Sequence, residues 1–151
     1  MLAAAIAALA GSFLMISYEN LGRKPRIPVL SQLYYTDDDG ATYYADSINI
    51  VPPYTHNGKT AFRAYVFRCG DGGIFIGYLE AFTPQVKQAK EASLANHDNP
   101  PIPEDFGRKL KLPLTGDKGW QNSGTPGYLK IMQVHCPNGG DDSNIEAVFP
   151  R

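Results

Sequence analysis

A chain of 151 residues is long enough for one domain with a buried core, once the apolar stretch at its N-terminus is set aside. Its 14 basic and 15 acidic residues give a net charge of −1, so no charged surface favours nucleic acid, which we exclude as a partner. The 12 prolines and 15 glycines, together with 9 tyrosines and 7 phenylalanines, are typical of short aromatic strands joined by turns, and they exclude a mainly helical domain.

The first predicted element is an apolar helix over residues 1–18, a segment that carries no charged side chain. At about 1.5 Å per residue this helix is about 27 Å long, close to the roughly 30 Å of a bilayer core. Small residues are frequent in the segment, and close packing between helices requires them, so we expect it to contact other helices, in lipid or in a filament core. The residues predicted to form this assembly face are Ala4, Ala7, Ala8, Gly11, Ser12 and Met15.

Residues 19–28 form a basic hinge in which Pro25 and Pro28 exclude helix and favour extended chain. No basic residue precedes the apolar run and no small-x-small site follows it, so cleavage after the run is not expected. If Met1 is the translation start, the basic hinge places the following domain in the cytoplasm. If Met1 is the terminus left by an earlier cleavage, that constraint disappears, and both interpretations stay open at this point.

Residues 29–151 are predicted to form a β-rich globular head. Its core is expected to be a hairpin, because residues 62–68 and 73–81 are strongly apolar and only a short glycine-containing turn separates them. One short helix should pack on the sheet, since Thr83 and Pro84 supply an N-cap and a first helical residue. The predicted fold class is α+β, an N-terminal apolar helix followed by an antiparallel sheet. Further strands are expected at 29–35, 41–45, 128–135 and 145–149.

Two loops contain residues that invite a functional interpretation. Three aspartates, Asp37 to Asp39, lie between the first two strands, but a calcium loop needs further oxygen ligands nearby, so we expect a solvated turn. Residues 97–125 are dense in proline and glycine and too long for a simple connection, so they form either an ordered surface loop or an interaction segment. Trp120, the only tryptophan, is predicted to hold this segment on the sheet rather than to contact a partner.

Cys69 and Cys136 lie in matching contexts, each directly after a predicted strand and shortly before a glycine pair. Two thiolates in place of four do not make a structural zinc site, so no metal is expected. The pair is better interpreted as one disulfide, which closes a loop of about 67 residues and stabilises the head by about 4 kcal/mol on a chain-entropy estimate. A disulfide in turn favours a head outside the cytoplasm.

An apolar N-terminal helix with no basic leader, followed by a β-rich head with a late cysteine pair, resembles the type IV pilins and pseudopilins. In that family a dedicated peptidase removes the leader, and the exposed helix packs with its copies into the core of a filament. The sequence departs from the family in two places. Ala5 occupies the position of the usual early glutamate, and the helical tract ends early, at Asn20 and Gly22. A plain single-pass anchor of an envelope protein stays open as the alternative.

No arrangement of residues indicates catalysis, so we expect neither an enzyme nor a cofactor. His135 is adjacent to Cys136, but neighbours on a strand point to opposite faces, which places the histidine badly as a base. Asp141 and Asp142 lie in a polar loop with no apolar context to shift their pKa.

We therefore expect a structural subunit of a cell-envelope or extracellular filament assembly, with its head facing outward. Its expected partners are copies of itself, through the N-terminal helix, and the membrane. The alternative is a single-pass membrane-anchored accessory subunit, which binds other subunits of a larger membrane complex through residues 97–125.

Overall fold

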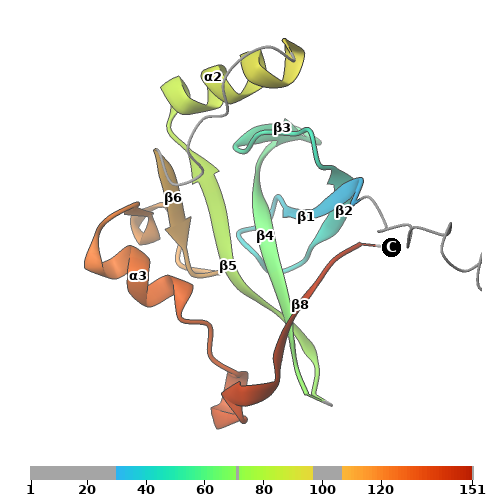
Figure 1. The fold of residues 1–151 in the computed structure, drawn as a ribbon, viewed down its shortest axis with the longest axis vertical. Helices are drawn as coiled ribbons and strands as arrows, with labels where there is room; N and C mark the ends of the chain where they lie inside the picture. The colour runs from blue at the N-terminus through green and yellow to red at the C-terminus, as the bar shows by residue number, and fades with distance from the viewer. Residues whose placement is uncertain (1–29, 71, 97–106, 151) are drawn as a thin grey trace, which may run out of the picture.

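One antiparallel sheet of eight strands dominates the computed structural model, which describes residues 30–70, 72–96 and 107–150 (Figure 1). Six strands follow one another in the order β2-β1-β4-β5-β6-β7, and β3 and β8 also pair with β4. The strands are β1 (Gln32–Thr36), β2 (Tyr44–Ser47), β3 (Tyr54–His56), β4 (Lys59–Cys69), β5 (Ile74–Phe82), β6 (Arg108–Lys111), β7 (Gln121–Asn122) and β8 (Ile145–Val148).

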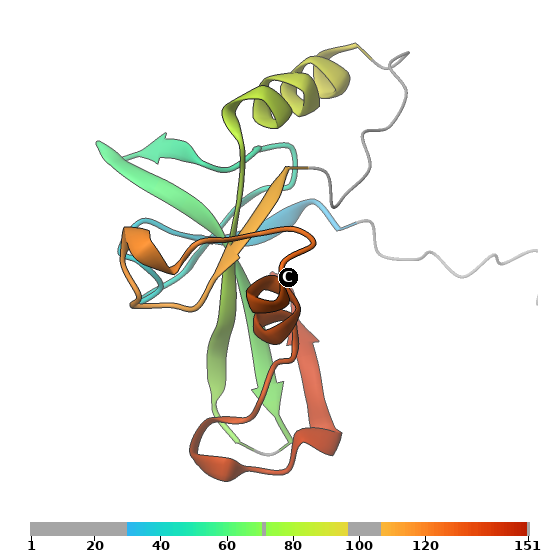
Figure 2. The ribbon, with the colours of Figure 1, turned by 90° about the vertical axis from the view of Figure 1, so that its left-hand side faces the viewer.

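Two short α-helices accompany the sheet. Helix α2 (Pro84–Ala95) lies at one end of the molecule, and helix α3 (Pro126–Met132) packs beside β6. Figure 2, turned by 90° from Figure 1, shows the two helices well separated along the long axis. Three 3₁₀ turns complete the described elements: η1 (Asp117–Gly119), η2 (Pro137–Gly139) and η3 (Asp142–Asn144).

The β4–β5 hairpin is the centre of the sheet, as the sequence predicted, and β4 also pairs with β1, β3 and β8. Because successive side chains of a strand point to opposite faces, the hairpin contributes to two separate core clusters. The clusters are Ala64, Val66 and Leu79 in one, and Tyr78, Leu110 and Tyr128 in the other.

The predicted fold class, an N-terminal apolar helix followed by a head with one packed helix, is wrong for the described structure. That structure is an eight-stranded antiparallel sheet with two short helices, and strand pairing around β4 organises it rather than the packing of an apolar helix. The predicted helix over residues 1–18, with the assembly residues within it, and the predicted hinge over residues 19–28 both lie outside the described residues. None of the described helices is long and apolar enough to cross a membrane.

The strand predicted over residues 128–135 is also wrong, because most of this stretch forms α3. The hydroxyl oxygen of Thr125 accepts a hydrogen bond from the backbone N–H of Tyr128 at 3.2 Å, and Pro126 occupies the first turn. A capped N-terminus with proline in its first turn favours a helix, and here it overrides the alternation of apolar residues.

The segment 97–125 is not simply a loop, since its described part contributes two strands to the sheet. Strand β6 pairs with β5 over four positions, from Leu79 opposite Lys111 to Phe82 opposite Arg108, and β7 pairs with β6. Three of the four β6 residues are basic, so the strand lacks the apolar alternation by which strands are recognised in a sequence.

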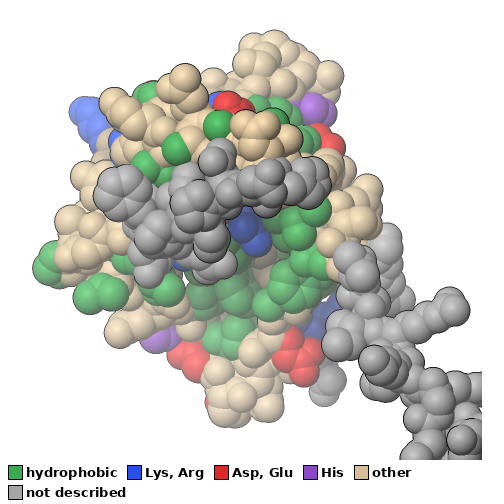
Figure 3. Space-filling model, turned by 45° about the horizontal axis from the view of Figure 1, so that its top comes forward, with side chains coloured by type: hydrophobic (Ala, Val, Ile, Leu, Met, Phe, Trp, Pro, Cys, Tyr) green, Lys and Arg blue, Asp and Glu red, His purple; other side chains and the backbone are tan. Residues whose placement is uncertain are grey.

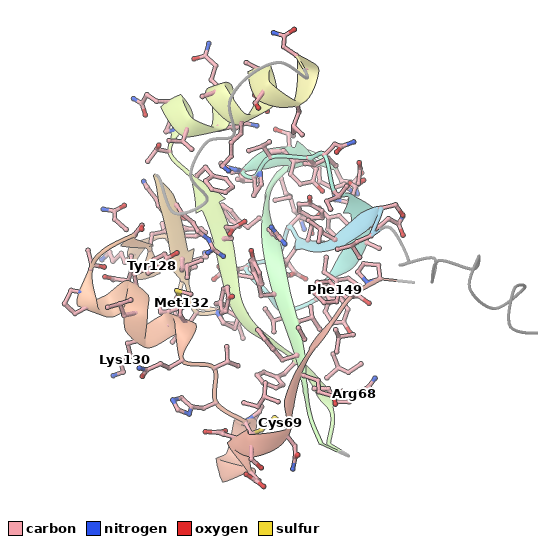
Figure 4. The ribbon with its side chains drawn as sticks, in the orientation of Figure 1. Arg68, Cys69, Tyr128, Lys130, Met132 and Phe149 are labelled. Carbon is pink, nitrogen blue, oxygen red and sulfur yellow. A yellow bond between two sulfur atoms is a disulfide. The ribbon has the colours of Figure 1, made fainter. Side chains whose placement is uncertain are left out.

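The predicted disulfide is present. Cys69, at the end of β4, is bonded to Cys136, and their Cα atoms lie 5.8 Å apart. The bond joins the end of the sheet, where β4 pairs with β8, to the connection that follows α3. Figure 4 labels Cys69 at this end, opposite the end that carries α2.

Candidate functional site

An apolar groove lies beside α3, with a cavity volume of about 750 Å³. This is the size of cavity in which proteins bind small molecules or single side-chain clusters of a partner. Three parts of the chain form it: the beginning of β5, the connection from β6 to β7, and α3 with the residues that follow it. The lining residues are Phe75, Ile76, Gly77, Leu112, Pro113, Thr115, Gly119, Gln121, Gly127, Lys130, Ile131, Gln133, Val134 and His135.

Helix α3 forms one wall of the groove, and its two faces differ. Tyr128 is 3% exposed and packs with Leu110 in the core, and Ile131, one turn later, packs against the same cluster. Lys130 and Ile131 line the cavity, whereas Leu129 and Met132, which are 58% and 44% exposed, do not. Figure 4 labels Tyr128, Lys130 and Met132 on this helix.

The floor of the groove depends on a β-bulge in the β4–β5 hairpin. Tyr65 pairs with Tyr78 and the next residue, Val66, pairs with Ile76, so Gly77 is the extra residue of β5. A Cβ atom at Gly77 would lie 2.7 Å from the ring of Phe67, so only glycine permits this close packing. The bulge thereby lets the phenylalanine ring close against β5 beneath the cavity.

The opposite wall is held by an ion pair between a buried lysine and a partly exposed aspartate, which the sequence did not indicate. Lys111 is 1% exposed, and its Nζ donates hydrogen bonds to the carboxylate of Asp39 and, at 3.3 Å, to the carbonyl of Gly116. The same ammonium lies 5.0 Å from the ring centroid of Phe62 and 4.9 Å from that of Trp120. Burial alone raises the pKa of Asp39, but the hydrogen bonds from Lys111 and Gly116 lower it below its usual value.

The interpretation of the three aspartates as a solvated turn is therefore wrong for Asp39. The backbone N–H of Gly116 also donates to its carboxylate, at 2.8 Å, so the β1–β2 turn is fixed to the connection that lines the groove. Asp38 closes the turn itself by accepting hydrogen bonds from the hydroxyls of Thr36 and Thr42. Trp120 packs on Phe62 with ring centroids 5.0 Å apart, which confirms the prediction that it holds this segment on the sheet.

A buried carboxylate, Glu80, lies in the middle of the sheet and is 2% exposed. Its Oε2 accepts hydrogen bonds from the Tyr65 hydroxyl at 2.9 Å and from Nε of Arg108, and its Oε1 accepts from Arg63 at 3.4 Å. Burial and the neighbouring Glu80 raise the pKa of Tyr65. Three donors thus satisfy the carboxylate, as the burial of a charge requires.

His56 and Asp37 form a pair at the β2–β3 end of the sheet. The Nδ1 atom of His56 lies 2.8 Å from the Asp37 carboxylate, and the imidazole ring stacks on Tyr44 with centroids 4.2 Å apart. The Tyr44 hydroxyl in turn lies 3.0 Å from that of Tyr54, which donates to Asp46. Burial raises the pKa of Tyr44. The side-chain amide of Asn57 lies 3.4 Å from each imidazole nitrogen, and the pair connects the turn after β1 to β3.

A second histidine–carboxylate pair, His135 and Asp142, lies beside the disulfide. The Nδ1 atom of His135 is 2.6 Å from the carboxylate, which also accepts a hydrogen bond from the backbone N–H of Cys136 at 2.7 Å. That backbone bond and the histidine lower the pKa of Asp142, and hydrogen bonds from Ser143 lower the pKa of Asp141. These shifts come from hydrogen bonds and not from apolar surroundings, which the sequence analysis found to be absent from this loop. Cys136 itself has no thiolate to offer, because it is in the disulfide.

The structure brings together one of the two predicted sets of site residues, Cys69 with Cys136. The other set, the assembly residues of the apolar segment, lies outside the described residues. Across residues 30–70, 72–96 and 107–150, no group of three or more histidine, cysteine, aspartate or glutamate side chains is placed to hold a metal. The groove was not predicted, although the Thr125-Pro126 pair was a visible signal for the helix that forms its wall.

Comparisons with known proteins give no family for the chain. No protein-family model matches it, and neither the curated proteins nor the solved structures contain a match.

Proposed function

We propose that this protein is a non-enzymatic accessory subunit of an assembly at the cell envelope or outside the cell. In this proposal the head binds a neighbouring subunit in the groove beside α3. The observation that carries the proposal is the groove itself, a cavity of about 750 Å³ whose lining includes the exposed side chain of Leu112. Exposed apolar side chains around a cavity are typical of a surface that buries itself against a partner.

Two features support the location. The Cys69–Cys136 disulfide favours an oxidising compartment, because cytosolic thiols are kept reduced. The uncharged stretch over residues 1–18 supplies a segment that a membrane or an apolar bundle accepts. Part of the predicted interaction segment, residues 112–121, lines the groove, which fits a role in binding other subunits.

A non-enzymatic role fits the polar clusters of the described chain. His56 and His135 are both bonded to carboxylates, and Glu80 is surrounded by donors that belong to the sheet. In each case the hydrogen bonds are used to fix strands or turns, so none of these groups has the nucleophile or open position that catalysis needs.

A second candidate is a structural filament subunit, whose partner in the groove is a second copy of the same chain. The small residues of the apolar stretch, Ala4, Ala7, Ala8 and Gly11 among them, favour it because they permit close helix packing. The two candidates make the same prediction for the groove and differ in the mass of what it binds.

The test is photo-crosslinking of the full-length chain in its native cells. A photoreactive amino acid replaces Leu112, which lines the groove, and Phe149 serves as the matched control because it is also apolar and exposed but lies directly after β8 (Figure 4). The proposal predicts one defined adduct from position 112 and none from position 149. An adduct of twice the chain's mass identifies the filament candidate, whereas equal or absent crosslinking at both positions contradicts both candidates.

A further inference from the structure

A second cavity, of about 340 Å³, lies under α2 at the end of the sheet away from the disulfide. It is enclosed by α2, by residues 48–52, and by the side of β4 and β5 that carries Arg63 and Glu80. Leu33, Val51 and Phe82 give it an apolar wall. Figure 3, which brings this end of the molecule forward, shows basic side chains in blue among hydrophobic ones in green. The cavity and the groove beside α3 share no lining residue.

Glu80, the one carboxylate among the described residues of the cavity wall, is already paired within the sheet. Glu80 receives hydrogen bonds on Oε2 from Tyr65 and from Arg108, which is itself largely buried. A carboxylate that is paired in this way has little remaining attraction for another cation. The net charge of the cavity wall is therefore positive and comes from its basic side chains, Arg63 and Lys90.

Two basic side chains line the cavity with donors to spare. Arg63 reaches Glu80 through one nitrogen at 3.4 Å, the long end of a hydrogen bond, and its guanidinium lies 4.5 Å from the ring centroid of Tyr65. Lys90, on α2, lies 4.7 Å over the ring of Phe82 and makes no ion pair with any described residue. The guanidinium fork of an arginine matches a carboxylate with two parallel hydrogen bonds.

We propose that this cavity binds a single-chain amphiphilic carboxylate, of the size of a medium-chain fatty acid anion. The carboxylate accepts hydrogen bonds from Arg63 and Lys90, and the hydrocarbon chain lies against Leu33, Val51 and Phe82. The volume of about 340 Å³ is at the lower end of ligand cavities, so one short chain fits and a two-chain lipid does not. This inference does not depend on the function proposed for the groove.

The attachment of α2 gives the ligand a structural consequence. Val86 is the only buried residue of the helix, and a hydrogen bond from Lys87 to the carbonyl of Val51 at 3.2 Å holds it to the 48–52 connection. Lys90 and Leu94 face the cavity from the second half of the helix. A bound amphiphile adds contacts to that half, so binding slows the exchange of its backbone amide hydrogens.

The experiment is a calorimetric titration of the full-length protein in a non-ionic detergent, against a blank of the same detergent. The probes are octanoate, octanol, which has the chain without the charge, and acetate, which has the charge without the chain. We expect saturable binding of octanoate at least about tenfold tighter than that of either control probe. Hydrogen exchange with and without octanoate then reports on residues 84–95.

Two variants test the basic residues. Arg63→Gln should weaken octanoate binding at least about tenfold, with partial recovery in Arg63→Lys, while Arg68→Gln, an exposed arginine of the same strand, leaves it unchanged. Lys90→Glu is a surface change on α2 that tests the second cation without disturbing Glu80. Equal affinity for octanol, or full octanoate affinity in both Arg63→Gln and Lys90→Glu, overturns the proposal, as does the absence of saturable binding.

Discussion

The two α-helices in the described part of the chain begin with the same pair of residues, Thr83-Pro84 in α2 and Thr125-Pro126 in α3, yet they are attached to the sheet in opposite ways. Thr125 caps its helix with a side-chain hydrogen bond, whereas Thr83 makes none. The 7-residue α3 buries Tyr128 in the core, and the 12-residue α2 buries only Val86. A start signal fixes where a helix begins, and packing of its faces decides how firmly it is held.

Because α3 is held more firmly than α2, the two proposed binding sites differ in how rigid their walls are. The groove lies between two fixed walls. Core contacts hold α3 on one side, and the Lys111–Asp39 pair holds the connection on the other side. The cavity under α2 is covered by a helix with little apolar contact, so ligand binding can change the stability of its cover. The groove is therefore a preformed surface for a partner, whereas a ligand in the cavity under α2 would also stabilise the helix that covers it.

Truncation of the buried side chain of each helix should give the largest difference in stability between the two helices. Tyr128→Ala removes a buried aromatic side chain, and we expect it to lower the free energy of unfolding by about 4 kcal/mol. Val86→Ala, the matched change in α2, should cost only about 1–2 kcal/mol because fewer atoms are removed. Urea unfolding followed by circular dichroism measures both. Equal losses would show that the two helices are anchored alike.

Reduction of the disulfide should have an effect of similar size. The bond closes a loop of 67 residues, and its loss should cost about 4 kcal/mol. Because Cys136 follows α3 closely, hydrogen exchange should accelerate at α3 and the residues after it more than at α2. A Cys69→Ser and Cys136→Ser double variant is the control for effects of the reductant, and faster exchange in α2 alone would contradict the prediction.

The two threonines provide the most direct comparison of the helices. Thr125→Ala removes a cap hydrogen bond to Tyr128 and should destabilise the protein by about 1 kcal/mol. Thr83→Ala removes no side-chain cap bond, so its effect should stay within a few tenths of a kcal/mol. Thermal unfolding of both variants, with the free energies of unfolding compared at one temperature, tests this difference in stability. A similar loss of stability in Thr83→Ala would contradict the prediction.

Much of the sheet could be predicted from the sequence because its signals are local. The β4–β5 hairpin has long apolar strands and a glycine turn, α2 has its Thr83-Pro84 start, and β8 has a short apolar pattern. The two cysteines were predicted to pair because their local contexts match, and they do.

The missed features depend on contacts between residues far apart in the sequence. Lys111 in β6 is buried because Asp39, 72 residues earlier in the chain, pairs with its ammonium group, and no local pattern indicates that contact. Arg108 in the same strand needs Glu80 for the same reason. In α3, the spacing of Tyr128 and Ile131 fits a helix, but the run of apolar residues around them favours a strand equally well. The groove follows from these elements, so it could not be predicted without them.

The smallest predicted effect concerns acid and the wall of the groove. Burial raises the pKa of Asp39, but its hydrogen bonds to Lys111 and Gly116 prevail and lower it below the ordinary 3.8, so the ionised carboxylate is favoured in the folded state. The stabilisation from this pair is complete above the unfolded-state value and is lost as the pH falls through the lower folded-state value.

Trp120, which lies 4.9 Å from the Lys111 ammonium, reports on this wall by its fluorescence. Between about pH 4 and the lower folded-state pKa, we expect a local change at Trp120 worth less than about 1 kcal/mol, since solvent screens a partly exposed carboxylate. In Asp39→Asn the side chain no longer titrates, so the change in fluorescence over this range should disappear while α2 behaves as in the parent chain. A pH response that persists in Asp39→Asn would assign the transition to another carboxylate, and the wall beside α3 would then be held by apolar contacts, as α3 itself is.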